Sequence, residues 1–351
     1  MTELTRYVKE LIRAEGPLSV AAFMEIALLH PLHGYYIKGD PLGVAGDFTT
    51  APEISQMFGE LMGLWIVEVW RKLGAPNPFV LLELGPGRGT LMADALRATA
   101  KVPGFHAAMK LFLIESNETL REQQLDRLAS YHPTYMGSME ELPDLPLFTI
   151  ANEYLDALPV HQYVRTGSGW RERMVGLDEK GNLAFVSASH DALLPLPDLL
   201  TFYELSPLAI STVRAITAHI VKFKGASLWI DYGYYVPDGA NTLQAVSGHK
   251  PVPPLSLVGH VDLTAHVDFA ALRLAAEKEG GIVAPLALQG EFLERLGIQL
   301  RAEQLRLRAA PIQCEAIDLA LQRLTSPEQM GNLFKVMAVT SAEVHDLPGF
   351  L

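Results

Sequence analysis

The feature that most constrains this chain is a short apolar run that ends in an acidic residue and three alternating glycines. It occupies residues 80–90, VLLELGPGRGT, and the residues that follow, 91–97, are compatible with a helix. β-Prone residues, then glycines, then helix formers predict a strand, a tight turn and the start of a helix. Glycines in such a turn adopt backbone angles closed to other residues and let a ligand lie against the main chain. The run therefore predicts a pocket for a nucleoside-containing cofactor, with a plain tight turn as the alternative.

The spacing of the glycines favours S-adenosylmethionine over a dinucleotide. A dinucleotide-binding loop follows G-x-G-x-x-G with an acid about 20 residues later, whereas this loop follows G-x-G-x-G. Glu83 suits a ligand that carries an ammonium and a sulfonium and no pyrophosphate. Glu115 ends a second apolar run, where its carboxylate could accept both ribose hydroxyls. Two strands that end in acids thus predict an S-adenosylmethionine site, with the cofactor-binding residues Glu83, Gly85, Pro86, Gly87, Gly89, Glu115, Ser116 and Asn152.

Composition excludes several classes of protein. The 351 residues can form one large α/β domain with insertions or two domains, and either buries a sizeable core. Hydrophobic residues make up 49% and charged residues 19%, which indicates a globular chain. The net charge of −12 argues against nonspecific binding to nucleic acid or to an anionic membrane, because both need basic patches. An acidic chain suits a cationic substrate.

Cysteine and histidine usage gives no metal site. Cys314 is the only cysteine, so the chain has no intramolecular disulfide and no Cys-rich zinc site. His30 and His33 lack an HExxH run or a Cys partner, so no metal is predicted. Residues 1–9, MTELTRYVK, resemble neither a secretion signal nor an Arg-rich transit peptide. No apolar run approaches the roughly 20 residues that span a bilayer. These features predict a cytoplasmic protein without membrane insertion.

From residue 79 onward, candidate strands alternate with candidate helices, which indicates a parallel sheet wound on both faces. The expected fold class is α/β, a Rossmann-like doubly wound sheet with N-terminal helices and an inserted substrate or partner region. Strands are predicted at residues 79–84, 110–115, 134–136, 147–150 and 228–231.

Other segments depart from this alternation. Two helices are predicted within residues 3–29, with Ser19 as N-cap of the second. An ordered loop at 30–52 and a long helix at 53–73 should follow. Residues 160–200 predict a small antiparallel insertion, and residues 236–262, rich in Pro and Gly, predict a lid or substrate loop. The predicted division is an N-terminal helical cap at 1–75 and a core with these two insertions at 76–351.

Polar residues follow the fourth predicted strand. In doubly wound sheets ligands bind beyond the carboxyl ends of the strands, so Asn152, Glu153 and Asp156 should face the pocket. Three polar side chains at this place could hold a methyl acceptor in line with a sulfonium. The alternative is the start of a helix, with Asn152 as its cap and the acids favourably placed against the helix dipole.

Several blocks together resemble the MidA-like S-adenosylmethionine-dependent methyltransferases. The blocks are residues 46–56 (GDFTTAPEISQ), 58–61 (FGEL), 83–91 (ELGPGRGTL), 151–162 (ANEYLDALPVHQ), 231–234 (DYGY) and 262–269 (DLTAHVDF). The resemblance implies a class I methyltransferase fold. Because the mitochondrial member of that family is a complex I assembly factor that methylates an arginine, it also implies ω-nitrogen dimethylation of an arginine in a respiratory subunit. Residues 254–261 depart from the family pattern, which expects a more acidic Pro-Gly-Glu-like stretch there.

The chemistry of such an acceptor suggests which residues act on it. A guanidinium stays protonated in proteins and its nitrogens are poor nucleophiles. Two carboxylates that grip it could localise a lone pair on one nitrogen and orient that nitrogen, with proton removal late. The candidates are Glu153, Asp156, Asp47 and Glu53, although Glu53 could simply stabilise the first turn of its helix. His266 and Asp268 could line the acceptor channel or cap the following helix.

Three classes of function follow from these observations. The first is a protein arginine methyltransferase whose partner is a protein substrate, such as a subunit of respiratory complex I. The second is a small-molecule methyltransferase, which would need a closed apolar acceptor pocket. The third is a non-catalytic assembly factor on the same fold, although such a scaffold has little need of Glu83, Glu115 and Glu153. Apolar helix stripes could serve a homodimer as well as a core.

Overall fold

The computed structural model describes residues 1–37, 50–167, 169–194, 196, 199–248 and 250–350. Asp47 and most of the predicted loop at 30–52 lie outside the described residues. The chain forms two compact units. We call Thr49–Leu155, Ser211–Gly233 and Phe269–Leu351 the sheet unit, and Met1–Phe48, Asp156–Ile210 and Tyr234–Asp268 the accessory unit. These units do not follow a single boundary at residue 75, and that boundary stays a prediction.

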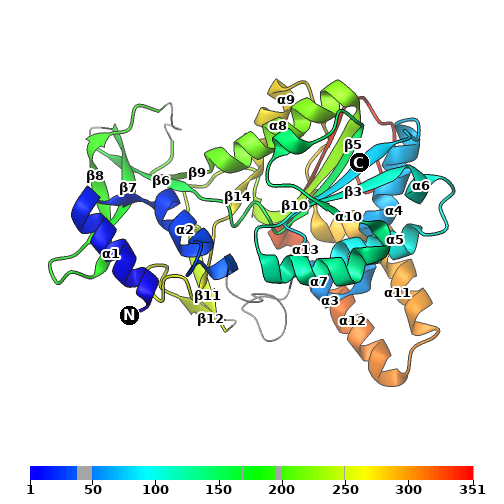
Figure 1. Ribbon diagram of the computed structural model, residues 1–351, viewed down its shortest axis with the longest axis horizontal. Helices are drawn as coiled ribbons and strands as arrows, with labels where there is room; N and C mark the ends of the chain where they lie inside the picture. The colour runs from blue at the N-terminus through cyan, green and yellow to red at the C-terminus, as the bar shows by residue number, and fades with distance from the viewer. Residues whose placement is uncertain (38–49, 168, 195, 197–198, 249, 351) are drawn as a thin grey trace. The chain divides into compact units, whose positions relative to one another are not determined.

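The sheet unit is built on a mostly parallel sheet (Figure 1). Five strands run parallel in the order β10-β5-β2-β3-β4, and antiparallel β17 separates β10 from the short edge strand β15. The bounds are β2 (Phe79–Leu84), β3 (Met109–Ile114), β4 (Thr134–Tyr135), β5 (Leu147–Asn152), β10 (Gly225–Tyr234), β15 (Ile282–Val283), β16 (Ala287–Leu288) and β17 (Phe334–Thr340). All five strands predicted from the sequence are present. The ends of four of them differ from the prediction by no more than two residues, whereas β10 is longer than predicted at both ends.

Helices cover both faces of this sheet. Alternate side chains of a strand point to opposite faces, and one set, including Leu81, Phe148 and Ile230, shares a core cluster with α4 and α5. On the other face a Cβ built on Gly281 would lie 2.6 Å from both Thr217 of α8 and Val339 of β17. The helices of the unit are α3 (Ala51–Ile54), α4 (Gln56–Lys72), α5 (Thr90–Thr99), α6 (Phe105–Ala108), α7 (Glu118–Leu128), α8 (Pro207–Phe223), α9 (Phe269–Lys278), α10 (Gln289–Arg295), α11 (Ile298–Arg306), α12 (Pro311–Thr325) and α13 (Met330–Leu333).

The long helix predicted at 53–73 is divided in two. Ser55 has an extended backbone, with φ −162° and ψ 138°, and therefore ends α3 and begins α4. Its hydroxyl accepts a hydrogen bond from the backbone N–H of Met57 at 3.2 Å, as an N-cap does. The prediction missed this break because the apolar spacing of residues 54–65 continues through it. The division separates Glu53 from α4 and makes it part of a short helix of its own.

The accessory unit contains the N-terminal helices and two antiparallel sheets. α1 (Glu3–Glu15) and α2 (Val20–Leu29) form as predicted, and Ser19 caps α2 by accepting from Ala22 N–H at 3.0 Å. One sheet has the order β1-β7-β6-β9, with β8 paired to β7. The second sheet has the order β12-β11-β13. Its strands β11 and β12 lie within residues 236–262, the stretch predicted as a lid or substrate loop, and β13 begins at the end of that stretch. The bounds are β1 (Leu18–Ser19), β6 (His161–Thr166), β7 (Gly169–Leu177), β8 (Leu183–Asp191), β9 (Phe202–Leu205), β11 (Gln244–Ser247), β12 (Lys250–Val252) and β13 (Asp262–Thr264).

None of the helices in the described ranges is both long enough and apolar enough to cross a bilayer.

We expect Gly225→Ala to lower the free energy of unfolding of the sheet unit by about 3 kcal/mol or more. Gly225 begins β10 at φ +142°, and a Cβ there would lie 1.8 Å from the carbonyl oxygen of Leu147 on β5. Gly104→Ala is the matched control, because Gly104 has φ +77° with no atom within 4 Å of its Cβ position. It should cost only about 1 kcal/mol. Chemical denaturation measures both, and equal losses would contradict the close approach of β10 to β5.

Candidate cofactor and active site

The glycine loop connects the end of β2 to the start of α5. Gly85, Gly87 and Gly89 all have positive φ, between 54° and 74°, and Gly89 precedes α5 directly. Left-handed backbone at alternate positions explains why this loop needs glycines and not other residues. At Gly85 the space matters too, because a Cβ would lie 2.9 Å from the ring of Tyr154. The loop therefore lies at the carboxyl edge of the sheet, with Gly85 and Gly87 partly accessible and Pro86 and Gly89 buried.

Glu83 is the buried carboxyl group beneath this loop. It is only 3% exposed, and its Oε2 has no hydrogen-bond partner among the described residues. Burial, and then the nearby charge of Glu115, raise the pKa of Glu83 to about 8. A buried carboxyl oxygen without a partner is costly, and a cationic group of a ligand would remove that cost. Glu83 thus fits the ammonium or sulfonium of the expected cofactor.

Glu115 follows β3, the strand beside β2. Its Oε1 accepts from Asn117 N–H at 2.9 Å, so the carboxylate is turned back toward the following residues, Ser116 included. Burial raises the pKa of Glu115, although these hydrogen bonds oppose the shift. Gln124 of α7 links the two strand ends, since its Nε2 donates to the Gly87 carbonyl at 2.6 Å and approaches Glu115 Oε2 at 3.4 Å.

The turn after β5 is held by a third carboxylate. Asp231 of β10 accepts from the N–H groups of Tyr154 and Leu155 at 3.2 and 2.9 Å. Glu153 lies in this turn at φ +50°, a strained value for a residue with a side chain, and its own N–H donates to the Ile230 carbonyl. No helix starts at Asn152 in the described chain, so the alternative in which Asn152 caps a helix is wrong. The positive φ and the hydrogen bond to Ile230 constrain the backbone at Glu153.

α3 brings two further groups to the same edge. The N–H of Ala51 donates to Glu153 Oε1 at 2.9 Å, and Asn152 Nδ2 donates to the same oxygen at 3.2 Å. Glu53 accepts from the Thr90 hydroxyl, and its Oε2 lies 3.6 Å from an Arg88 nitrogen of the glycine loop. The structure therefore groups Glu53, Asn152 and Glu153 with the loop, within the sheet unit.

The other predicted acceptor residues belong to the accessory unit. Asp156 is buried there, and its carbonyl accepts from Ala265 N–H at 3.0 Å. The N–H of His266 donates to the Thr242 hydroxyl at 2.8 Å, and Asp268 accepts from the Tyr203 hydroxyl at 3.3 Å. Each of these contacts is made within the accessory unit. Their roles, like that of Asp47, stay predictions.

Sequence reasoning gave no role to three residues that shape this edge: Gln124, Arg88 and Asp231. Gln124 is one polar residue of a mostly polar helix. The sequence signals for Asp231 were its place at the end of the predicted strand 228–231 and its part in the block 231–234; β10 pairs with β5 in the structure.

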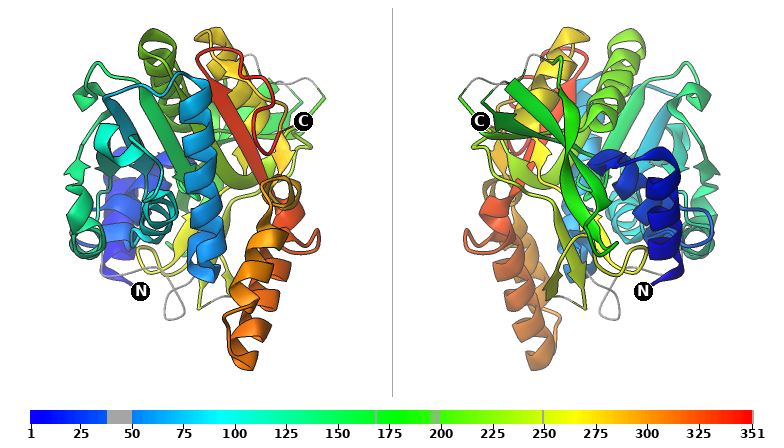
Figure 2. Two further views of the ribbon diagram at one scale, coloured as in Figure 1. Left: turned by 90° about the vertical axis from the view of Figure 1, so that its right-hand side faces the viewer. Right: turned by 90° about the vertical axis from the view of Figure 1, so that its left-hand side faces the viewer.

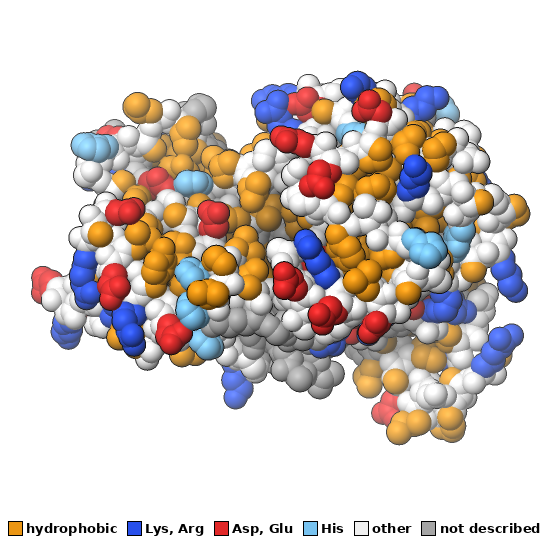
Figure 3. Space-filling view, in the orientation of Figure 1, with side chains coloured by type: hydrophobic (Ala, Val, Ile, Leu, Met, Phe, Trp, Pro, Cys, Tyr) orange, Lys and Arg blue, Asp and Glu red, His pale blue; other side chains and the backbone are white. Residues whose placement is uncertain are grey.

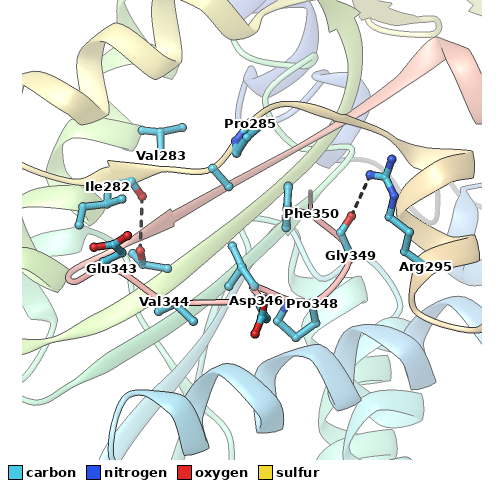
Figure 4. A pocket seen from close by; sticks show the side chains of 13 residues that line it. Ile282, Val283, Pro285, Arg295, Glu343, Val344, Asp346, Pro348, Gly349 and Phe350 are labelled. Atoms are coloured by element: carbon cyan, nitrogen blue, oxygen red, sulfur yellow. Dashed lines mark hydrogen bonds between the residues drawn. The ribbon is translucent and has the colours of Figure 1, made fainter.

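A cavity of about 510 Å³ lies at the opposite edge of the sheet (Figure 4). Its lining mixes polar and apolar surface, with Val283, Pro285, Val344 and Phe350 among the apolar residues and Arg295 at one end. Thr340, which also lines it, pairs with Ala226 at the beginning of β10. Since the glycine loop follows the carboxyl ends of the parallel strands, this cavity is not part of the cofactor site.

A doubly wound sheet with a glycine loop, two strand-end carboxyls and a tethered Glu153 defines a Rossmann-like, S-adenosylmethionine-binding transferase. A family model described as S-adenosyl-L-methionine-dependent methyltransferase matches residues 61–286. The chain therefore belongs to this methyltransferase family. The Glu83 oxygen without a partner and the left-handed glycines of the loop fit the cofactor, and Glu83, Glu115 and Gly85 to Gly89 are the residues that would hold it.

Relatives and solved structures agree with this assignment. "Protein arginine methyltransferase NDUFAF7 homolog, mitochondrial" of Drosophila melanogaster is 34% identical, over 96% of this chain and 84% of the relative. The human "Protein arginine methyltransferase NDUFAF7, mitochondrial" is 33% identical, over 97% and 83%. A crystal structure of a COG1565 superfamily member from Burkholderia thailandensis, bound to S-adenosyl-homocysteine, has a TM-score of 0.85 at 26% identity and covers 98% of this chain and 94% of its own.

These findings confirm the predicted family, fold class and cofactor. They contradict the predicted cytoplasmic location, because the relatives from Drosophila melanogaster and Homo sapiens are named as mitochondrial proteins. The prediction was wrong because it relied on the first residues of the chain. Targeting segments are read and removed apart from the folded core, so the core records no location.

Binding of S-adenosylmethionine should strengthen as the pH rises from about 6 to about 8. Burial raises the pKa of Glu83 to about 8 in the free protein, so the group is protonated at the lower end of this range and about half ionised at its upper end. A cationic ligand favours the carboxylate, so binding releases a proton and the association constant should rise by up to about tenfold per pH unit. Isothermal titration in two buffers of different ionisation enthalpy measures the affinity and the proton release.

The Glu83→Gln variant should bind the cofactor more weakly and with a flatter pH profile. Glu118→Gln, on the exposed first turn of α7, is the matched control and should keep the wild-type profile. An unchanged slope in Glu83→Gln would mean that a different group, such as Glu115, releases the proton.

Gly87→Val should abolish cofactor binding and leave the fold largely intact. Gly87 has φ +54°, and a branched side chain there would strain the loop and fill the space beside its main chain. Gly74→Val is the control, because Gly74 has φ +93° with no atom within 4 Å of its Cβ position. Circular dichroism reports the fold and isothermal titration the binding. Retained binding in Gly87→Val would contradict the assignment of the glycine loop as the cofactor site.

Proposed function

We propose that this chain methylates an ω-nitrogen of an arginine in a protein substrate. The observation that carries the proposal is Glu153, whose carboxylate accepts from Ala51 and Asn152 and whose backbone N–H donates to Ile230 in a turn with positive φ. The names of the Drosophila melanogaster and human relatives support an arginine as the acceptor. The resemblance to the MidA-like family supports a subunit of respiratory complex I as the finer choice of substrate.

The bound cofactor would supply an electrophilic methyl group on sulfur, and the protein's part is to hold the acceptor. An arginine side chain arrives as a planar cation whose lone pairs are delocalised. A carboxylate that accepts from two of its N–H groups orients the plane and concentrates electron density on the remaining nitrogen. Glu153 would make this contact. Because the nitrogen loses its proton after the new N–C bond forms, no strong base is needed before transfer.

Glu53 and Asn152 would position the Glu153 carboxylate for its contact with the guanidinium. Asn152 donates to Glu153 Oε1 and so restricts the rotation of the carboxylate. Glu53 contacts Thr90 and Arg88, which fixes α3 on the glycine loop. Since Ala51 of α3 in turn donates to Glu153, these contacts couple the cofactor loop to the acceptor group. Positioning of this kind supplies a large part of the acceleration in transfer reactions.

Glu153→Gln should keep the affinity for S-adenosylmethionine within about threefold and lower methyl transfer by about a hundredfold or more. Glutamine preserves the shape and can still accept from Ala51, but it lacks the charge that holds a guanidinium. The assay is transfer of a labelled methyl group to an extract of cells that lack this protein, with mass spectrometry to locate the modified residue.

The control for this assay is Glu140→Gln, which alters an exposed carboxylate of a 3-10 turn, Met139–Glu141. It should transfer methyl groups at the wild-type rate. Full activity in Glu153→Gln would mean that another residue binds the acceptor guanidinium. Label that appears on a small molecule and never on arginine would contradict the proposed substrate.

A further inference from the structure

The helical hairpin formed by α11 and α12 projects from the sheet of its unit (Figures 1 and 2). The inner face of α12 packs into the main core cluster through Leu321 and Leu324, which are 8% and 0% exposed. Its outer face is also apolar but uncovered, since Ile312 and Leu319 are 78% and 60% exposed. Figure 3 shows hydrophobic side chains at the surface of this projection. An apolar outer face on a projecting helix needs an explanation beyond packing of the core.

These residues form one line along the helix. Positions 312, 316, 319 and 323 follow the i, i+4, i+7, i+11 spacing, which places them on a single face, and Glu315 borders it. We call Ile312, Glu315, Ala316, Leu319 and Arg323 the outer stripe; all five are exposed. Counted at 100° per residue, the stripe lies opposite the buried Leu321 and Leu324. Scattered apolar surface residues are common, whereas a continuous stripe marks an interaction site.

The charges of the outer stripe would complement those of a second copy of the stripe in antiparallel orientation. Glu315 lies four residues before Leu319 and Arg323 lies four residues after it, so the stripe reads acid, leucine, base at equal spacing. An antiparallel copy whose two-fold axis passes Leu319 would place Glu315 against Arg323 of the partner subunit, and the symmetry makes this pair twice. Within the described chain neither Glu315 nor Arg323 takes part in an ion pair, in contrast to Arg306, which pairs with Asp318.

The charge of the hairpin as a whole favours a second copy as the occupant. Two chains of net charge −12 repel each other over most of their surface. Residues 298–325 carry four arginines and three carboxylates, so this segment departs from the acidity of the rest. Two copies of the chain can therefore approach each other at the hairpin without the repulsion between their acidic surfaces. An isologous contact is also the commonest form of oligomer in soluble proteins.

We propose that the outer stripe of α12 joins two copies of this chain into an isologous dimer, with Leu319 at the two-fold axis. Leu319 packs against its symmetry mate at the centre of the contact. The two Glu315–Arg323 pairs set the antiparallel register. The stripe residues are not part of the glycine-loop site, so the dimer is a property separate from methyl transfer.

The first test is the mass of the chain in solution. Wild-type protein at about 100 μM should sediment at twice its chain mass of 38.5 kDa, and Leu319→Lys should sediment as a monomer. Leu274→Lys is the control, since Leu274 is a similarly exposed leucine, 53%, on α9. It should leave the dimer intact. All three proteins should titrate S-adenosylmethionine equally, which shows that the variants are folded.

A charge swap tests the register. Glu315→Arg and Arg323→Glu should each weaken the dimer by at least about tenfold, because each places like charges opposite one another. The double variant restores both pairs and should recover most of the wild-type dissociation constant. A monomeric wild-type chain would mean that a different occupant covers the stripe and would overturn the proposal. So would a dimer that survives Leu319→Lys, or a double variant as weak as the single ones.

Discussion

Parallel pairing of β2 with β3 and β5 is the constraint on which the functional edge depends. It aligns Leu84 with Ile114 of β3 and with Ala151 of β5, so the residues that follow all emerge at one edge of the sheet. The glycine loop, the Glu115 turn and the Asn152–Glu153 turn meet there for that reason. Parallel strands also bury both faces, which leaves their ends as the natural place for a ligand.

Burial then decides the electrostatics of this edge. Glu83 and Glu115 both have raised pKa values, and burial is the main cause for each. Glu115 is partly satisfied by its own turn, whereas one Glu83 oxygen has no partner in the described structure. A cofactor with a positive charge would stabilise the ionised form of this unsatisfied group, whereas a pyrophosphate would oppose its ionisation. The arrangement explains physically why a methyl-donor cofactor, and not a dinucleotide, belongs to this loop.

The parts of the fold with strong periodic or glycine signals could be predicted from the sequence. β2 and its loop were located by alternate glycines after a buried run, whereas β17 was missed because its apolar residues are nearly continuous and resemble a buried helix. The break at Ser55 leaves no trace in the apolar spacing, so it was missed as well. Among site residues, Gln124 and Asp231 act through backbone contacts made by tertiary structure, and no sequence pattern records such contacts. The division of acceptor candidates between two units is likewise a result of chain topology.

A crystal structure of this chain with S-adenosyl-homocysteine would test the central claim, that the edge formed by β2, β3 and β5 is the cofactor site. The account predicts the ligand against the main chain of residues 85–89, with its ribose hydroxyls on the Glu115 carboxylate and its amino group toward Glu83. A ligand in the cavity near Arg295, or at the loop but remote from both carboxylates, would contradict it.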